Sequence, residues 1–264
     1  EISGTIDEIL RHAITKLSHL HFVAAEEYRR RAIQLGEPPE QVFLVGGLGV
    51  DSIKRMQLLD RVSLEDSLGY KLGSRNLLIT FHPVTLEDST AEDQLTELLA
   101  ALEVLKETRL IFTLPNADTD GRILIDRVMQ FVAQQSNACA HQSLGQLRYL
   151  SCIAQVDGVV GNSSSGLLEV PSFNKGTINI GDRQRGRLQA SSIINCEPDR
   201  ESIGAALERL YSADFQKSLN QVTNPYGEGG SSEKVVNVLK NVAIPDLIKK
   251  TFYDLPNNSD SKSN

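Results

Sequence analysis

The chain alternates amphipathic segments with short apolar runs. Apolar residues recur at helical spacing in residues 9–17 and 26–35, and the short apolar run His21–Ala24 lies between them. A second run, Val42–Val45, is followed by a helical pattern over residues 51–59. A spacing near 3.6 residues is typical of a helix packed on one face, and short β-branched runs are typical of buried strands. The alternation therefore predicts βαβ units around a parallel sheet.

The same alternation resumes beyond a polar, loosely patterned stretch from Ser63 to Arg75. Strands are predicted over residues 76–81, 109–114, 158–160 and 176–180, and helices over residues 91–108, 120–135, 143–154, 166–171, 201–211 and 232–243. This pattern predicts a doubly wound Rossmann-like α/β domain over residues 53–243.

The segments on either side of this domain are different in kind. Residues 1–52 are interpreted as the remnant of a preceding Rossmann-like domain, because the chain opens on Glu1 and a helix begins almost at once. Residues 244–264 are predicted to form a crossing helix and a disordered tail, the tail starting at the polar run from Asn257.

Composition narrows the function classes. A formal net charge of −7 argues against a nucleic-acid partner bound through a basic surface. Three cysteines, Cys139, Cys152 and Cys196, form neither an even set nor a Cys/His cluster, which predicts free thiols and no metal site. No apolar run approaches the roughly 20 residues of a membrane span, and no signal peptide pattern opens the chain. We therefore expect a cytoplasmic protein without a membrane partner.

The segment Gly161–Gly166 (GNSSSG) follows an apolar strand and precedes a helix. Glycine and serine there allow close backbone approach, and a helix N-terminus adds partial positive charge. Asn162, Ser163 and Ser164 are therefore candidates for holding an anion such as a diphosphate. A plain capped turn is the alternative, since serine is a preferred helix cap.

A second candidate anion loop, Gly181–Arg187 (GDRQRGR), follows the next predicted strand. Arg183 and Arg187 are its candidate ligands, because guanidinium groups match phosphate oxygens; an exposed basic loop is the alternative. Glu169, about one turn into the helix after GNSSSG, is a candidate for accepting the two hydroxyls of a ribose. Its alternative role is a partner of the helix dipole.

Further polar residues stand at strand ends and at the opening of the chain. His82 in TFHPVT and Asn116 and Asp118 in LPNAD follow predicted strands. The opening carries Glu1, Asp7, Glu8, Arg11 and His12, with Asp7–Arg11 and Glu8–His12 spaced to meet on one helix face. Such groups suit proton transfer, and an ordinary charged helix start is the alternative.

Five segments together resemble a known family. EISGTIDEILRHAITKLSHLHF, FHPVT, LPNAD, GNSSSGLLEV and INIGDRQRGR stand in the order found in the hydrolysing UDP-N-acetylglucosamine 2-epimerases. The resemblance covers residues 1–243 and is greatest to the bacterial branch that feeds sialic-acid-type and related nonulosonic acid synthesis.

The resemblance implies a GT-B-like fold whose active site lies between two Rossmann-like halves. The C-terminal half would hold UDP, with the GNSSSG loop on the diphosphate, Glu169 on the ribose and Arg183 or Arg187 adding positive charge. Asn116 and Asp118 would touch the sugar or the base. Members of the family expel UDP by anti-elimination across C1–C2 and then add water to the 2-acetamidoglucal, without metal or redox cofactor.

The catalytic candidates implied by the family pattern are those that could supply a base, an acid and a group to position water. They are Glu1, Asp7, Arg11, His12 and His82. Complete members have a first half that would precede Glu1, so we expect this chain alone to be inactive and the full-length enzyme to be a homo-oligomer. Two alternatives stay open: a non-hydrolysing UDP-N-acetylglucosamine 2-epimerase, and an inactive UDP-binding fragment.

Overall fold

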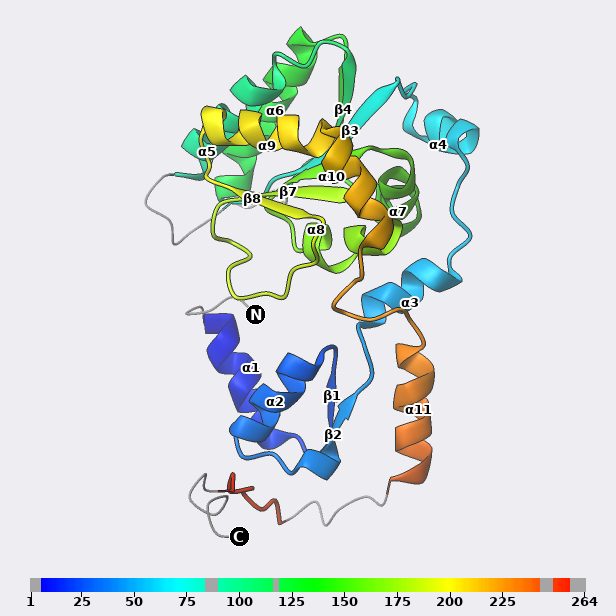
Figure 1. The fold of residues 1–264 in the computed structure, drawn as a ribbon. Helices are drawn as coiled ribbons and strands as arrows, with labels where there is room; N and C mark the ends of the chain where they lie inside the picture. The colour runs from blue at the N-terminus through cyan, green and yellow to red at the C-terminus, as the bar shows by residue number, and fades with distance from the viewer. Residues whose placement is uncertain (1–5, 84–89, 116–118, 243–248, 257–264) are drawn as a thin grey trace. The chain divides into compact units, whose positions relative to one another are not determined.

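The computed structural model describes residues 6–83, 90–115, 119–242 and 249–256 (Figure 1). The predicted site residues Glu1, Asn116 and Asp118, and the predicted tail from Asn257, lie outside the described residues. The chain divides into two compact units. The larger unit runs from Arg55 to Asn224, and the smaller unit combines the residues up to Lys54 with those from Pro225 onwards. Residues 225–242, which the sequence pattern placed with the second domain, thus pack with the first segment.

The larger unit is built on a six-stranded parallel sheet of order β5-β4-β3-β6-β7-β8. The strands are β3 Arg75–Thr80, β4 Thr108–Thr113, β5 Ala138–His141, β6 Gly158–Gly161, β7 Gly176–Ile180 and β8 Ile193–Cys196. The chain adds β4 and β5 on one side of β3, then returns and adds β6, β7 and β8 on the other. The order therefore reverses between β3 and β6, the place where doubly wound sheets bind their ligands.

Helices cover both faces of this sheet (Figure 1). On one face lie α5 Ala91–Leu102, α6 Thr119–Gln134 and α9 Arg200–Tyr211. Leu77 and Ile79 of β3, and Phe81 just after it, join the main hydrophobic core under these helices. The other face is covered by α7 Gly145–Gln155, which packs on β3 and on α4 Arg61–Leu68. Because both faces are covered, every residue of β6 and every residue of β3 after Arg75 is buried.

Short elements complete the larger unit. They are α8 Ser165–Leu168, the 3₁₀ turn Val170–Phe173, α10 Ala213–Ser218 and the 3₁₀ turn Leu219–Gln221. α8 and its following 3₁₀ turn replace the single helix predicted over residues 166–171.

The described part of the smaller unit contains one βαβ motif and three further helices. Its elements are α1 Ile6–Leu17, β1 His21–Val23, α2 Glu26–Gln34, the 3₁₀ turn Pro39–Gln41, β2 Val42–Leu44, α3 Leu48–Arg55 and α11 Ser231–Asn241. β1 and β2 pair in parallel, with His21 opposite Val42. The buried Asp51 carboxylate of α3 accepts hydrogen bonds from the backbone N–H groups of Ser231 (2.8 Å) and Ser232 (2.6 Å), so it caps α11.

Residues 249–256 return to the smaller unit without regular secondary structure, so this described part of the predicted crossing helix is not helical. Their anchor is Glu37, whose side chain is fully buried. Lys250 Nζ lies 2.6 Å and His21 Nε2 2.8 Å from its Oε2, and Lys16 Nζ lies 2.7 Å from its Oε1. We call these four residues the Glu37 cluster. The backbone N–H of Tyr253 also donates to the Gly36 carbonyl at 2.9 Å.

The stretch predicted to be loosely patterned begins in a helix, which corrects the sequence prediction. α4 is started by Asp60, which accepts a hydrogen bond from Ser63 N–H at 2.8 Å, and ended by Gly69 in the left-handed conformation. Only Leu64 and Leu68 form its apolar face, so the periodicity is too short to recognise. The helix predicted over residues 51–59 starts and ends earlier, as α3.

The sequence pattern also missed β5 and β8, the two edge strands of the sheet. β5 consists of half-buried residues, and β8 buries only its first two. Edge strands have fewer apolar neighbours, so their sequences carry a weak strand signal. α5 ends at Leu102 rather than at residue 108, because the chain must turn before Thr108 begins β4 opposite Arg75.

Candidate functional site

The candidate site lies at the carboxyl ends of β3, β6 and β7, which are neighbours in the sheet. In a parallel sheet the carboxyl ends of all strands meet at one edge, so the loops that follow these strands converge. They contain His82, the segment Asn162–Ser165 and the segment Gly181–Arg187.

Asn162 joins the first two of these loops. Its side chain is buried, and its Oδ1 accepts a hydrogen bond from His82 N–H at 2.8 Å. Its Nδ2 donates to the His82 carbonyl at 2.9 Å. Both ends of the amide thus pair with the backbone of His82. Asn162, predicted as a ligand of the diphosphate, holds the loop through this side chain.

The third loop is tied to the same residue. The Asn162 carbonyl accepts hydrogen bonds from Arg183 Nη1 (3.1 Å) and Gln184 Nε2 (2.8 Å). Gln184 is fully buried. Sequence reasoning missed Gln184, and the only signal was a neutral amide between arginines, in a loop predicted to bind through its charges.

Positive charge gathers at this junction. Burial lowers the pKa of Arg183, and the neighbouring Arg187 lowers it further. Neither guanidinium makes an ion pair with any carboxylate of the described residues, and Arg187 Nε is buried without a hydrogen-bond partner among them. Burial, followed by the charge of Arg183, also lowers the pKa of His82, so its imidazole is neutral near pH 7. The junction therefore offers unneutralised positive charge and a neutral histidine, which suits an anionic ligand.

The serine loop approaches the sheet very closely. Gly161 has a φ of 141°, and a Cβ there would lie 1.9 Å from the Thr80 carbonyl oxygen. Only glycine fits where β6 passes this close to β3. Beyond it, Ser163 Oγ accepts a hydrogen bond from Ser165 N–H at 3.4 Å.

Glu169 stands at the end of α8, and its carboxylate accepts a hydrogen bond from the Ser165 hydroxyl. Both side chains are half-buried. Glu169 is therefore oriented by its own loop rather than by a basic side chain.

The structure brings together four of the predicted site residues by direct contact or mutual charge effect: His82, Asn162, Arg183 and Arg187. Ser163, Ser164 and Glu169 lie on the same loop as Asn162. Arg11 and His12 lie on α1 of the smaller unit, as does the backbone of Asp7, whose side chain is outside the described part of the chain.

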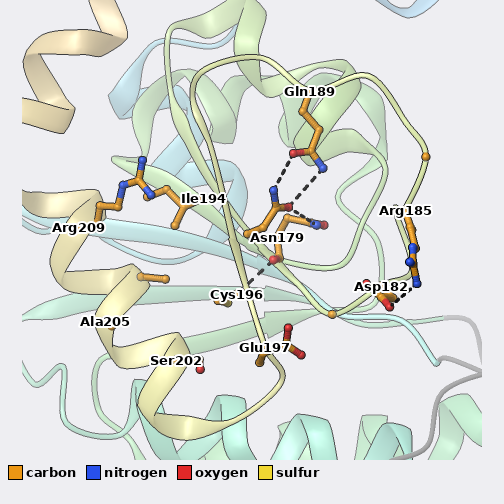
Figure 2. Close-up of a pocket in the computed structure, with 14 residues that line it drawn as sticks. Asn179, Asp182, Arg185, Gln189, Ile194, Cys196, Glu197, Ser202, Ala205 and Arg209 are labelled. Atoms are coloured by element: carbon orange, nitrogen blue, oxygen red, sulfur yellow. Dashed lines mark hydrogen bonds and ion pairs between the residues drawn. The ribbon is translucent and has the colours of Figure 1, made fainter.

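A separate cavity of about 640 Å³ lies beside β7, β8 and α9 (Figure 2). It is lined by Asp182 and Arg185 of the arginine loop, which pair at 3.4 Å, but not by Arg183 or Arg187. Its amides pair only in part, since Asn195 Nδ2 donates to Gln189 Oε1 at 2.7 Å while Asn179 Oδ1 is buried without a hydrogen-bond partner among the described residues. The cavity thus shares the arginine loop with the predicted anion site but not its two candidate arginines.

Two kinds of feature are absent from the described residues. No group of three or more His, Cys, Asp or Glu side chains in this part of the chain could hold a metal ion. Nor does any helix within the described ranges have the length and apolarity of a membrane span.

The sequence profile that describes UDP-N-acetylglucosamine 2-epimerases matches residues 1–240. The chain belongs to this family. It is 41% identical to a Campylobacter jejuni protein named GDP/UDP-N,N'-diacetylbacillosamine 2-epimerase (hydrolyzing), over 96% of this chain and 66% of that protein. It is 31% identical to a Legionella pneumophila UDP-N,N'-diacetylbacillosamine 2-epimerase (hydrolyzing), over 94% of this chain and 64% of that protein. The chain thus spans about two thirds of the length of these curated relatives.

Solved structures of UDP-N-acetylglucosamine 2-epimerases share the fold. The Staphylococcus aureus protein MnaA, solved with UDP, has a TM-score of 0.73 at 16% identity, over 90% of this chain and 64% of that one. The Neisseria meningitidis UDP-GlcNAc 2-epimerase, solved with UDP-GlcNAc, has a TM-score of 0.65 at 17% identity, over 90% and 66%. The predicted α/β, GT-B-like fold class with parallel sheets is confirmed.

Proposed function

We propose that the protein is a hydrolysing UDP-sugar 2-epimerase, which converts a UDP-N-acetylhexosamine into UDP and an N-acetylmannosamine-type sugar by anti-elimination and hydration. The observation that carries the proposal is the junction at the strand ends, where two guanidinium groups without carboxylate partners in the described chain lie beside the serine loop. Family membership and the names of the two hydrolysing relatives support it.

In this proposal each part of the junction has a task in expelling UDP. The serine loop and Arg187 hold the diphosphate, whose negative charge increases as its bond to the sugar breaks. Guanidinium groups fixed before the reaction stabilise that developing charge without reorganisation. Glu169 accepts the ribose hydroxyls. The neutral His82 imidazole is suited to accept a hydrogen bond or a proton from the sugar.

The remaining predicted residues complete the proposal. Glu1, Asp7, Arg11 and His12 are assigned to proton transfer and to positioning water, and Asn116 and Asp118 to the sugar or the base. The proposed substrate class includes sugars with one or two acetamido groups, and the two hydrolysing relatives carry names for diacetylbacillosamine substrates.

Binding of UDP to the 264-residue chain, measured by isothermal titration calorimetry, tests the proposal. Arg187→Ala is expected to weaken binding by about 1.5–3 kcal/mol, the usual value of a charge-assisted contact. Arg185→Ala is the matched control, because Arg185 is exposed, pairs with Asp182 and faces the separate cavity. Absence of UDP binding, or equal losses in the two variants, would refute the assignment of the junction.

A non-hydrolysing epimerase is the second candidate, since the chain is 28% identical to a Neisseria meningitidis protein named UDP-N-acetylglucosamine 2-epimerase without that qualifier. The reaction products distinguish the hydrolysing from the non-hydrolysing epimerase. Incubation with a UDP-N-acetylhexosamine releases free UDP and a reducing sugar in the hydrolysing case, and a UDP-linked epimer in the other. Because the 264-residue chain alone is expected to be inactive, this product test is made on the chain joined to the first half of a complete family member. UDP binding without turnover in that joined protein would indicate a binding module.

A further inference from the structure

The orientation of Glu169 is set by a neighbouring hydroxyl. Ser165 and Glu169 are one helical turn apart, at the beginning and the end of α8, and Ser165 Oγ donates to Glu169 Oε2. The backbone beneath them is fixed as well, because Glu169 N–H donates to the Ser165 carbonyl at 2.9 Å and Ser172 N–H donates to the Glu169 carbonyl at 3.0 Å. With the backbone fixed, the conformational freedom that remains to Glu169 is its side-chain rotamer. The hydrogen bond from the Ser165 hydroxyl selects that rotamer.

The packing of α8 makes this arrangement rigid. Leu167 and Val170, which flank the turn, are fully buried. Thr177 Oγ1 of β7 donates to the Gly166 carbonyl at 2.8 Å, and a Cβ at Gly166 would lie 2.6 Å from Thr177 Cγ2. The serine thus stands on a segment locked to the sheet, as a positioning group must.

A buried phenol lies next to the pair. The Tyr149 hydroxyl of α7 is buried and has no hydrogen-bond partner within the described residues. Burial raises its pKa, the hydroxyls of Ser165 and Thr80 lower it, and the charge of Glu169 raises it again. The phenol therefore stays protonated. Thr80 is itself held by a 2.6 Å hydrogen bond between its hydroxyl and that of Thr113.

We propose that Ser165 is the positioning residue that orients the Glu169 carboxylate to accept both hydroxyls of a ribose. The pair thereby sets a preference for ribonucleotides over 2′-deoxyribonucleotides. A diol presents two donors side by side, and a carboxylate receives both only when its plane is aligned with them. This inference rests on the proposed function, because it requires that Glu169 meets a nucleotide.

The test compares the affinities of UDP and 2′-deoxy-UDP for the 264-residue chain, by calorimetry or, for weak binding, by ligand-detected NMR. The unaltered chain is expected to prefer UDP by about tenfold, the value of a charge-assisted hydrogen bond. Ser165→Ala is expected to weaken UDP binding about fivefold and to change 2′-deoxy-UDP binding less than about twofold. Ser165→Thr keeps a hydroxyl and should retain the preference for UDP.

Further variants separate positioning from general structural loss. Glu169→Gln should abolish the preference, and adding Ser165→Ala to it should cause no further loss, because the serine acts through the glutamate. Ser67→Ala is the matched control, since the Ser67 hydroxyl donates only to the Leu64 carbonyl of its own helix; both affinities should stay unchanged.

Two results would overturn the inference. One is an equal loss of UDP and 2′-deoxy-UDP binding in Ser165→Ala, which would show a merely structural role. The other is an unaltered chain that binds both nucleotides equally. If the chain binds UDP and Arg187→Ala weakens that binding, the proposed function stands even when the inference about Ser165 fails. A chain that binds neither nucleotide would refute both the inference and the proposed function.

Discussion

Gly161 is the residue at which the candidate site depends most directly on local geometry. Its φ of 141° is rarely adopted by residues with a side chain, and a Cβ would lie 1.9 Å from the carbonyl oxygen of Thr80 on the adjacent strand. The same residue begins the turn into the serine loop. The absence of a side chain at Gly161 therefore allows the serine loop to lie close to the sheet.

Gly161→Ala is expected to lower the free energy of unfolding by about 2–4 kcal/mol, because the strands must separate or the turn must change conformation. Urea denaturation followed by circular dichroism measures the loss. Gly204→Ala is the matched control: Gly204 lies in α9, a Cβ there would meet no atom within 4 Å, and the variant should gain about 0.5–1 kcal/mol. A Gly161→Ala chain as stable as the original would contradict the geometry.

At this scale the sequence predicted the types of residue in the site but not their orientation. His82, Arg183 and Arg187 were found because polar residues at the carboxyl ends of parallel strands converge. The pattern did not distinguish Arg185, which faces the separate cavity, from Arg183, which bonds to the Asn162 carbonyl. It also missed Gln184, because the direction of a side chain in a loop follows from backbone angles and not from residue type.

Among the elements, α11 has a start that depends on a distant residue. The Asp51 carboxylate accepts hydrogen bonds from the first two N–H groups of α11, although Asp51 and Ser231 are separated by 180 positions. A carboxylate at a helix N-terminus satisfies donors that have no partner in the helix and also meets the positive end of its dipole.

Asp51→Ala is therefore expected to destabilise the smaller unit by about 1–3 kcal/mol and to reduce hydrogen-exchange protection throughout α11. Exchange followed by mass spectrometry of peptides from residues 231–241 measures this. Thr90→Ala is the matched control, because Thr90 caps α5 in the larger unit through Asp93 N–H at 3.1 Å. Loss of protection in α11 should be absent from that variant, and its presence would show that the cap is not the cause.

Elements with a complete apolar face were predicted, whereas those with a partial face were not. The central strands β3, β4, β6 and β7 were recognised within about one residue, because burial on both faces favours the large apolar residues that they contain. β5 and β8 were not predicted because an edge strand has a neighbouring strand on one side only. α4 was not predicted because its two buried leucines span a single turn.

The molecule as a whole uses buried charge to hold the segment at residues 249–256. Burial lowers the pKa of His21 from its ordinary 6.5, more strongly than Glu37 raises it. Burial would raise the pKa of Glu37, but hydrogen bonds from Lys16 and Lys250 outweigh it and hold that pKa below 4.5. In both cases the unfolded chain binds protons more readily than the folded one, so acid favours unfolding.

We expect the stability of the smaller unit to fall in two steps as the pH decreases. The first begins near pH 6.5 as His21 is protonated in the unfolded chain, and the second begins near pH 4.5 as Glu37 is. Glu37→Gln should remove the second step and lower stability at pH 7 by about 3 kcal/mol, since it leaves the half-buried Lys250 without a counter-charge. Thermal unfolding between about pH 4 and pH 8 measures both effects.

The matched control is Glu92→Gln, which removes a half-exposed carboxylate that pairs with Arg127 at 2.6 Å on the surface of the larger unit. Exposed pairs contribute about 0–1 kcal/mol, so its stability should change little at any pH. A Glu37→Gln chain that behaved like this control would show that the Glu37 cluster does not anchor the segment.

The overall class of the molecule followed from the sequence, while the division of the chain did not. Alternating helices and strands predict a parallel α/β sheet, and its order places the switch point between β3 and β6. The transfer of residues 225–242 to the smaller unit depends on contacts such as that between Gly47 N–H and the Tyr226 carbonyl, at 2.7 Å. Such contacts join residues far apart in the sequence and leave no periodic trace.

The junction at Asn162 has a consequence for how these loops evolve. The side-chain amide of Asn162 pairs with the backbone of His82, and its backbone carbonyl accepts hydrogen bonds from Arg183 and Gln184. A substitution in any of the three loops therefore changes the contacts that the other two loops must make. Homologues should therefore inherit these positions as a set, and a loop transplanted singly between relatives should fail where the three transplanted together succeed.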